Sequence, residues 1–109
     1  MMIYQPGDSV PSKTAVYDNA ELPLDALQDA VGGYIEVVPH FDTMLVEGRR
    51  ERCAVFCNET GKLHDLPRNK HATALWRSAV RHRGLPPIID ELVGPVAICL
   101  GDDEWLASL

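Results

Sequence analysis

Two adjacent glycines, Gly32 and Gly33, join a segment with helical periodicity to a segment with strand periodicity. Before them, Leu24, Leu27 and Val31 are spaced three and four residues apart, which predicts an apolar stripe along one side of a helix. A glycine directly after the last residue of that stripe is typical of a helix end, where the chain adopts a left-handed conformation. The helix is therefore expected to stop at the glycines.

The residues after the glycines, 34–38, predict a half-buried strand, because Ile35 and Val37 alternate with side chains of the opposite face. A dinucleotide-binding loop runs in the order strand, glycine loop, helix. Here the order is reversed, so the helix N-terminus that would bind a phosphate lies at the wrong end. We interpret the glycine pair as a structural joint.

The length of 109 residues predicts one domain, 1–109. Alternating apolar residues and turn residues predict further extended segments. Strands are expected at 1–5, 14–18, 43–48, 53–57, 62–66 and 91–101. The turn "NETG" between two of them predicts a hairpin over 52–66 with Gly61 at its tip.

A second helix is predicted after Pro67, with Asn69 as its N-cap and an apolar face that includes Trp76 and Val80. Gly84 and the prolines that follow are expected to end it. Because the strands cluster in hairpins, the predicted fold is α+β, a mainly antiparallel sheet of about four to six strands with two helices packed on one face.

The three cysteines, an odd number, fit a reducing compartment. Cys53 and Cys57 would lie roughly 13 Å apart along a strand, beyond the reach of a disulfide. We interpret all three as small buried apolar side chains. No apolar run approaches ~18 residues and the N-terminus does not resemble a secretory signal, so a cytoplasmic protein with no membrane contact is expected.

Charge is distributed unevenly along the chain. Residues 1–48 carry eight acids and one lysine, 49–83 carry nine cations and three acids, and 84–109 carry five acids and no lysine or arginine. Two interpretations stay open at this point. The middle segment is either neutralised internally by the acidic ends or presents a basic face to an anion.

The sequence predicts no enzyme, no catalytic residue, no metal site and no cofactor. It contains no phosphate loop of the nucleotide-binding type and no nucleophile elbow. His64 and Asp65 lack the partner ligands of a metal phosphohydrolase, and the spacing of Cys57, His64 and His71 matches no zinc motif.

The candidate ligand-binding residues lie around the predicted hairpin tip and the start of the second helix. They are Asn58, Lys62, Arg68, Asn69 and Lys70. Two amides, three cations and the free N–H groups of a helix start suit a phosphate or a nucleotide. The structural alternative is that Asn58 makes a turn, Asn69 caps a helix and the cations are solvated.

Several segments, taken together and in this order, resemble the family of the domain of unknown function 3846. They are "LDALQDAVGGYIEVV", "CNETGKLHDLPRNKHAT" and "DELVGPVAI", which span about residues 20–101. Similar proteins are encoded by bacteriophages, plasmids and other mobile elements, some beside antirestriction genes, and no catalytic mechanism is associated with them. The resemblance implies an accessory protein in a bacterial host and carries over no catalytic residue.

The expected activity is therefore binding to a host protein, for example a component of a host defence system. The alternative is capture of a nucleotide or another anion by the five candidate residues. Nucleic acid is disfavoured as a partner, because only Trp76 interleaves with the arginines of the second helix. A homodimer formed through an edge strand such as 93–100 is left open.

Overall fold

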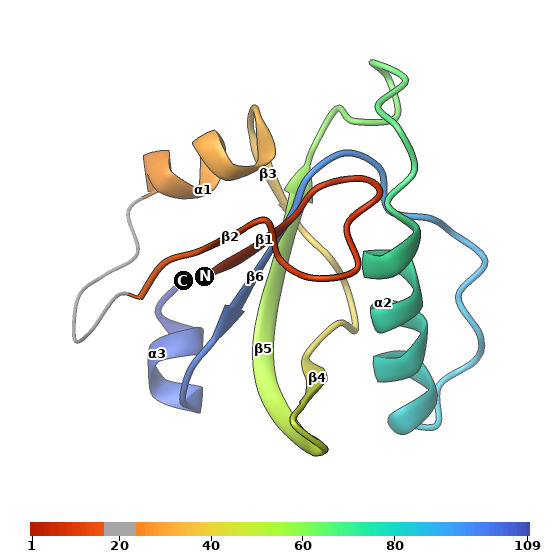
Figure 1. The fold of residues 1–109 in the computed structure, drawn as a ribbon. Coiled ribbons are helices and arrows are strands. Elements are labelled where there is room, and N and C mark those ends of the chain that lie inside the picture. Colours follow the sequence, from red (N-terminus) through yellow and green to blue (C-terminus); the bar gives the residue numbers. More distant parts are fainter. Residues whose placement is uncertain (17–23) are drawn as a thin grey trace.

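A six-stranded antiparallel sheet carries helices on both of its faces (Figure 1). The computed structural model describes residues 1–16 and 24–109. In chain order the elements are β1 (Met2–Tyr4), β2 (Lys13–Thr14), α1 (Leu24–Val31), β3 (Ile35–Val37), β4 (Thr43–Val46), β5 (Arg49–Asn58), α2 (Lys70–His82), β6 (Val96–Leu100) and α3 (Asp103–Ala107). The α+β class and the antiparallel sheet are confirmed.

The strand order is β2-β1-β6-β5-β3, and β4 pairs with the first half of β5. The long strand β5 therefore has β6 on one side, and β4 and β3 in succession on the other. On this path the sheet ends at β2 and at β3.

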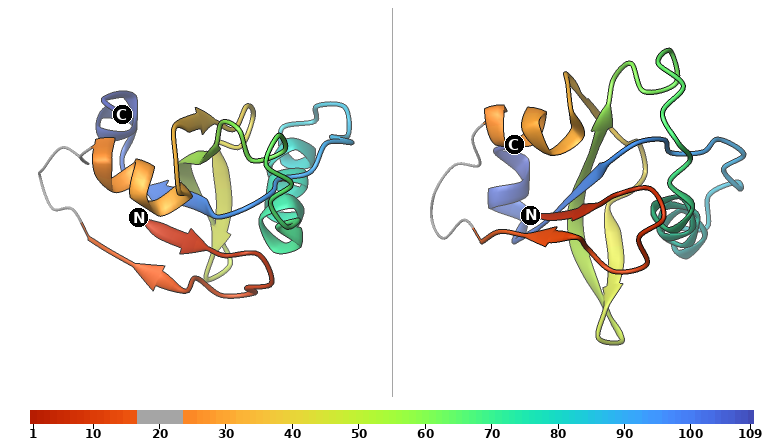
Figure 2. Two further views of the ribbon diagram at one scale, coloured as in Figure 1. Left: turned by 90° about the horizontal axis from the view of Figure 1, so that it is seen from above. Right: turned by 45° about the horizontal axis from the view of Figure 1, so that its top comes forward.

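The prediction that the helices share one face is wrong. Along β6, Val96 and Ile98 pack in the cluster that contains the buried side of α2, whereas Ala97 and Cys99 pack in the cluster that contains α1. Trp105 of α3 joins this second cluster. Figure 2 shows α1 and α3 on one side of the sheet and α2 on the other. A strand covered on both faces is a nearly continuous apolar run, which explains "VAICL".

The central position of β6 also corrects the expectation of an edge strand at 93–100. Pro95 lies directly before β6, and its neighbour Val93 makes only an isolated bridge to Arg68. Proline interrupts the strand there because it has no N–H to donate to a neighbour. The strand β6 therefore lies between β1 and β5 and is not an edge strand of the sheet that the described residues form.

The hairpin predicted over 52–66 is likewise wrong. The strand β5 turns back at the Glu47–Gly48 tip, where the φ angles of 50° and 81° are those of a two-residue hairpin turn. After Asn58 the chain forms compact turns instead of a strand, and Gly61 is buried. A Cβ on Gly61 would lie 2.9 Å from Val93 Cγ2, so this glycine allows close packing and is not an exposed tip.

Two further predictions concern the glycine joint and the strand at 14–18. The glycine joint is confirmed, because Gly32 has a φ of 78° and the Gly33 N–H donates to the carbonyl of Gln28 at 3.0 Å, as in a helix end of the Schellman type. The predicted strand 14–18 is confirmed only in that β2 includes Thr14, and its residues 17 and 18 lie outside the described part of the chain.

Candidate functional site

Asn69 is a fully buried structural residue, with an exposed fraction of 0%. Its Oδ1 accepts the Ala72 N–H at 3.2 Å, which confirms it as the N-cap of α2. Its Nδ2 donates to the carbonyls of Tyr4 at 2.9 Å and Gly94 at 3.0 Å. The amide therefore ties α2 to β1 and to the segment before β6, and its polar atoms already have protein partners.

Asn58 also has a structural role. Its Nδ2 donates to the carbonyl of Val31 at 3.1 Å, and its Oδ1 accepts the Thr60 N–H at 2.9 Å. The first bond holds the end of α1 against the end of β5, and the second shapes the turn that follows. Of the two open interpretations for these amides, the structure supports the turn and the cap.

Four of the nine cations of the middle segment pair with acids from the two acidic ends. Lys62 pairs with Asp90, and Arg68 Nε lies 3.1 Å from a Glu91 carboxylate oxygen. Arg52 pairs with Asp103 and Arg83 with Asp42. Internal neutralisation by the acidic ends therefore accounts for these four cations. Among the residues described, Lys70 has no carboxylate within ion-pair distance.

The five candidate residues do not form one site. Asn58 and Lys62 line a cavity of about 210 Å³ beside β3. Arg68 and Lys70 line a separate, open cavity of about 350 Å³ together with His71 and residues 7–9. Asn69 lines neither of these two cavities.

The cavity beside β3, called here the β3 cavity, is acidic. Val38, Cys57 and Trp76 line it together with Asn58 and Lys62, and Trp76 is fixed by a hydrogen bond from its Nε1 to the carbonyl of Pro39 at 2.8 Å. Its acidic lining residues are Glu36, Glu59, Asp90 and Glu91. Four carboxylates against one lysine favour a cationic group over the anion expected from the sequence.

The chemistry of Cys57 reflects this acidic setting. Burial raises the pKa of its thiol to about 11, and the negative charge of Glu36 raises it further in the same direction. The buried thiols of Cys53 and Cys99 have pKa values raised to about 12 and about 11 by burial. All three thiols are therefore protonated at neutral pH, which leaves no thiolate nucleophile.

The outer edge of β3 is open. The Glu59 N–H donates to the carbonyl of Tyr34, and the Val38 N–H donates to the carbonyl of Val55, each at 2.9 Å. Because backbone groups of an antiparallel strand alternate between its two sides, the N–H and C=O groups of Ile35 and Val37 point away from β5. No strand of the described chain pairs with that side.

Sequence reasoning missed this edge and the acidic lining beside it. The alternation in 34–38 identified the strand but carries no information on which strands pair with it. Only the structure shows that Tyr34, Glu36 and Val37 are exposed, and two of these are large apolar side chains, with exposed fractions of 73% for Tyr34 and 62% for Val37.

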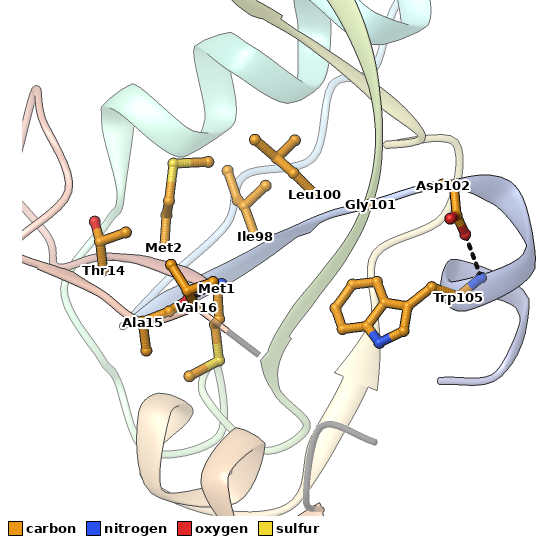
Figure 3. Close-up of a pocket in the computed structure, with 10 residues that line it drawn as sticks. All are labelled: Met1, Met2, Thr14, Ala15, Val16, Ile98, Leu100, Gly101, Asp102 and Trp105. Atoms are coloured by element: carbon orange, nitrogen blue, oxygen red, sulfur yellow. Dashed lines mark hydrogen bonds between the residues drawn. The ribbon is translucent and has the colours of Figure 1, made fainter. Parts of the chain in front are cut away.

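A larger cavity of about 440 Å³ lies at the other end of the sheet (Figure 3). Its polar groups are engaged within the protein: the Met1 ammonium donates to the Ala15 carbonyl at 2.7 Å, and Asp102 Oδ1 accepts the Trp105 N–H at 2.8 Å. Val16, on its lining, is the last described residue before 17–23. This cavity is a weaker candidate because nothing on its lining selects a ligand.

Within residues 1–16 and 24–109, no group of three or more His, Cys, Asp or Glu side chains is arranged to hold a metal ion. In the same part of the chain, no helix has the length and apolar character needed to cross a membrane.

Comparison with known proteins identifies a family without assigning an activity. Neither the curated proteins nor the solved structures give a match. One family model, the domain of unknown function (DUF3846), matches residues 1–109, which extends the resemblance carried by residues 20–101 to both ends of the chain. The chain belongs to this family of domains of unknown function.

Proposed function

We propose that this chain is a non-catalytic accessory protein of a bacteriophage or mobile element that acts in the bacterial cytoplasm by binding a host protein. The observation that carries the proposal is the open edge of β3, where unpaired backbone groups lie next to the exposed side chains of Tyr34 and Val37. Natural proteins usually cover or charge such an edge, because it is a template for pairing with another chain.

The buried thiols support a binding role over a catalytic one. Cys53, Cys57 and Cys99 have pKa values of about 11 to 12, far above the range of activated cysteine nucleophiles. The hydrogen bonds made by Asn58 and Asn69 also favour a binding role over a catalytic one, because each side chain holds two segments of the fold together.

The proposal is tested by affinity purification from lysate of the bacterium that carries the element. A host protein is expected to remain bound in a stable stoichiometric complex, and the complex is then reconstituted from the two purified proteins. The matched comparison is a variant with Tyr34→Ser and Val37→Ser, which removes apolar surface from exposed positions without touching the core. Recovery of no partner at any salt concentration would contradict the proposal.

A second candidate function is capture of a nucleotide or another small anion at the start of α2. The observation in its favour is that Arg68, Lys70 and His71 line one cavity. Asp8 lines the same cavity and Glu91 pairs with Arg68, so the positive charge there is partly offset.

This candidate is tested by thermal unfolding with a panel of nucleotides. A saturable rise in Tm, lost in Lys70→Ala and kept in the exposed control Lys13→Ala, would support it. The absence of a shift with every nucleotide in the panel would exclude it.

A further inference from the structure

We infer that the binding partner adds an extended segment to the outer edge of β3 and places a basic side chain, Arg or Lys, against Glu36 at the mouth of the β3 cavity. This inference rests on the proposed function, because it specifies how that partner is recognised. It joins two features of the structure: a set of unpaired backbone groups and a negatively charged cavity beside them.

The backbone of β3 fixes the register of the added segment. The outward groups belong to Ile35 and Val37, so an antiparallel segment would form its hydrogen bonds with those two residues. Glu36 lies between them, at a position that forms no hydrogen bond on the outer side. Side chains at such positions approach each other most closely, with Cα atoms about 4.5 Å apart. The partner residue opposite Glu36 is therefore the one whose charge matters most.

The charge of Glu36 is not compensated within the described chain. Asp90 and Glu91 are held by Lys62 and Arg68, whereas Glu36 and Glu59 have no cation within ion-pair distance among the described residues. Both glutamates line the β3 cavity, and Glu36 lies directly opposite Cys57, another residue of its lining. Opposite charges on directly facing residues stabilise a strand pair.

The same charge argues against a second copy of this chain as the occupant. An antiparallel pairing of β3 with β3 of another copy, centred on Glu36, would place two carboxylates opposite each other. Facing like charges destabilise a strand pair. The edge is thus protected against self-pairing by the residue that favours a basic partner.

Cavity size and neighbouring apolar surface fit one long side chain. The lining of this volume of about 210 Å³ includes Cys57 and Trp76, against which the methylene stem of an arginine or lysine can pack. Tyr34 and Val37 are both more than half exposed: Tyr34 shares the face of Glu36, and Val37 lies on the opposite face, so each face of the edge offers apolar contact to an added segment.

The test is selection of random linear peptides displayed against the immobilised full chain, followed by fluorescence-polarisation measurements on the enriched peptides. Enriched sequences are expected to share a basic residue within a β-branched or aromatic context. Replacement of that basic residue by glutamine should weaken binding by at least about fivefold, which corresponds to about 1 kcal/mol.

Two variants separate the backbone contribution from the charge contribution. Val37→Pro removes an N–H that points outward and is not used in pairing with β5, so the fold is retained while binding should fall at least about tenfold. Val37→Thr keeps that N–H and removes only apolar surface, so it should weaken binding less than Val37→Pro does. Glu36→Lys should discriminate against basic peptides and select peptides with an acidic residue at the same position.

Failure of this inference is distinguishable from failure of the proposed function. If a host protein is retained equally by the Val37→Pro and Glu36→Lys variants, or if no basic peptide is enriched, the inference is wrong while the binding function stands. If neither a host protein nor any peptide binds, both are wrong. Circular dichroism and Tm of each variant verify that a loss of binding does not reflect unfolding.

Discussion

Glu36 lies directly opposite Cys57 in the β3–β5 pair, where the two side chains share the face that α2 covers. Burial and the carboxylate of Glu36 together raise the pKa of the Cys57 thiol to about 11. The pH at which the Cys57 thiol titrates therefore depends on the charge of Glu36, which lies beside the open edge of the sheet.

Glu36→Gln is expected to lower the pKa of Cys57, because it removes a negative charge that disfavours the thiolate. The pH dependence of Cys57 alkylation, mapped by mass spectrometry, measures the change. Glu47→Gln at the hairpin tip is the matched control, since Glu47 does not contribute to that shift. An unchanged Cys57 profile in Glu36→Gln would mean that Glu36 does not face the cavity.

Stability is expected to fall at alkaline pH. The three thiols have pKa values of about 11 to 12 in the folded chain against an ordinary value of 9.0, so the unfolded chain releases these protons first as the pH rises. Their contribution to the free energy of unfolding is complete below pH 9 and is lost between pH 9 and 12. Urea unfolding across this range measures it, and Cys99→Ala, which lacks one of the thiols, should show a shallower decline. A flat stability profile up to the highest pH would contradict the burial of these thiols.

Asn69→Ala is expected to lower the free energy of unfolding by about 3 kcal/mol or more. The substitution removes the cap of α2 and leaves the buried carbonyls of Tyr4 and Gly94 without their donor. Asn69→Asp keeps an acceptor for the Ala72 N–H but loses the two donated bonds, so it separates capping from cross-linking. A loss of under about 1 kcal/mol in Asn69→Ala would contradict the role of this amide as a link between α2 and the sheet.

The contact between the glycine joint and β5 is testable by a double-mutant cycle. A Cβ on Gly33 would lie 2.9 Å from Asn58 Nδ2, so Gly33→Ala should displace that amide from the Val31 carbonyl and cost about 1 kcal/mol. In an Asn58→Ala background the obstacle is absent, and Gly33→Ala should be neutral or slightly stabilising. Denaturant unfolding of the four proteins gives the coupling energy. Additive effects would show that the two residues are not in contact.

Local patterns predicted the elements whose signals are contained in a few neighbouring residues. The spacing of Leu24, Leu27 and Val31 and the glycine after it identified α1 and its end, and Asn69 identified the start of α2. These features depend on backbone geometry within one or two turns, which the sequence encodes directly.

The errors concern relationships between distant segments. "KLHDL" has the alternation of a strand, but Gly61 packs against Val93 and the chain turns there instead. The continuous apolar run of β6 is the pattern of a strand covered on both faces, and the prediction of helices on one face overlooked it. The five candidate residues are close in sequence, yet two of them line one cavity, two line another and Asn69 lines neither.

Hydrogen–deuterium exchange of the backbone amides of Ile35 and Val37 tests most directly the claim that a partner segment pairs with the outer edge of β3. The free chain is compared with the chain bound to its purified host partner or to a selected basic peptide. The account predicts that both amides exchange rapidly in the free chain, because they point away from β5, and become protected in the complex while the Glu36 amide changes little. Tight binding with no change in the exchange of Ile35 and Val37 would show that recognition occurs elsewhere and would contradict the account.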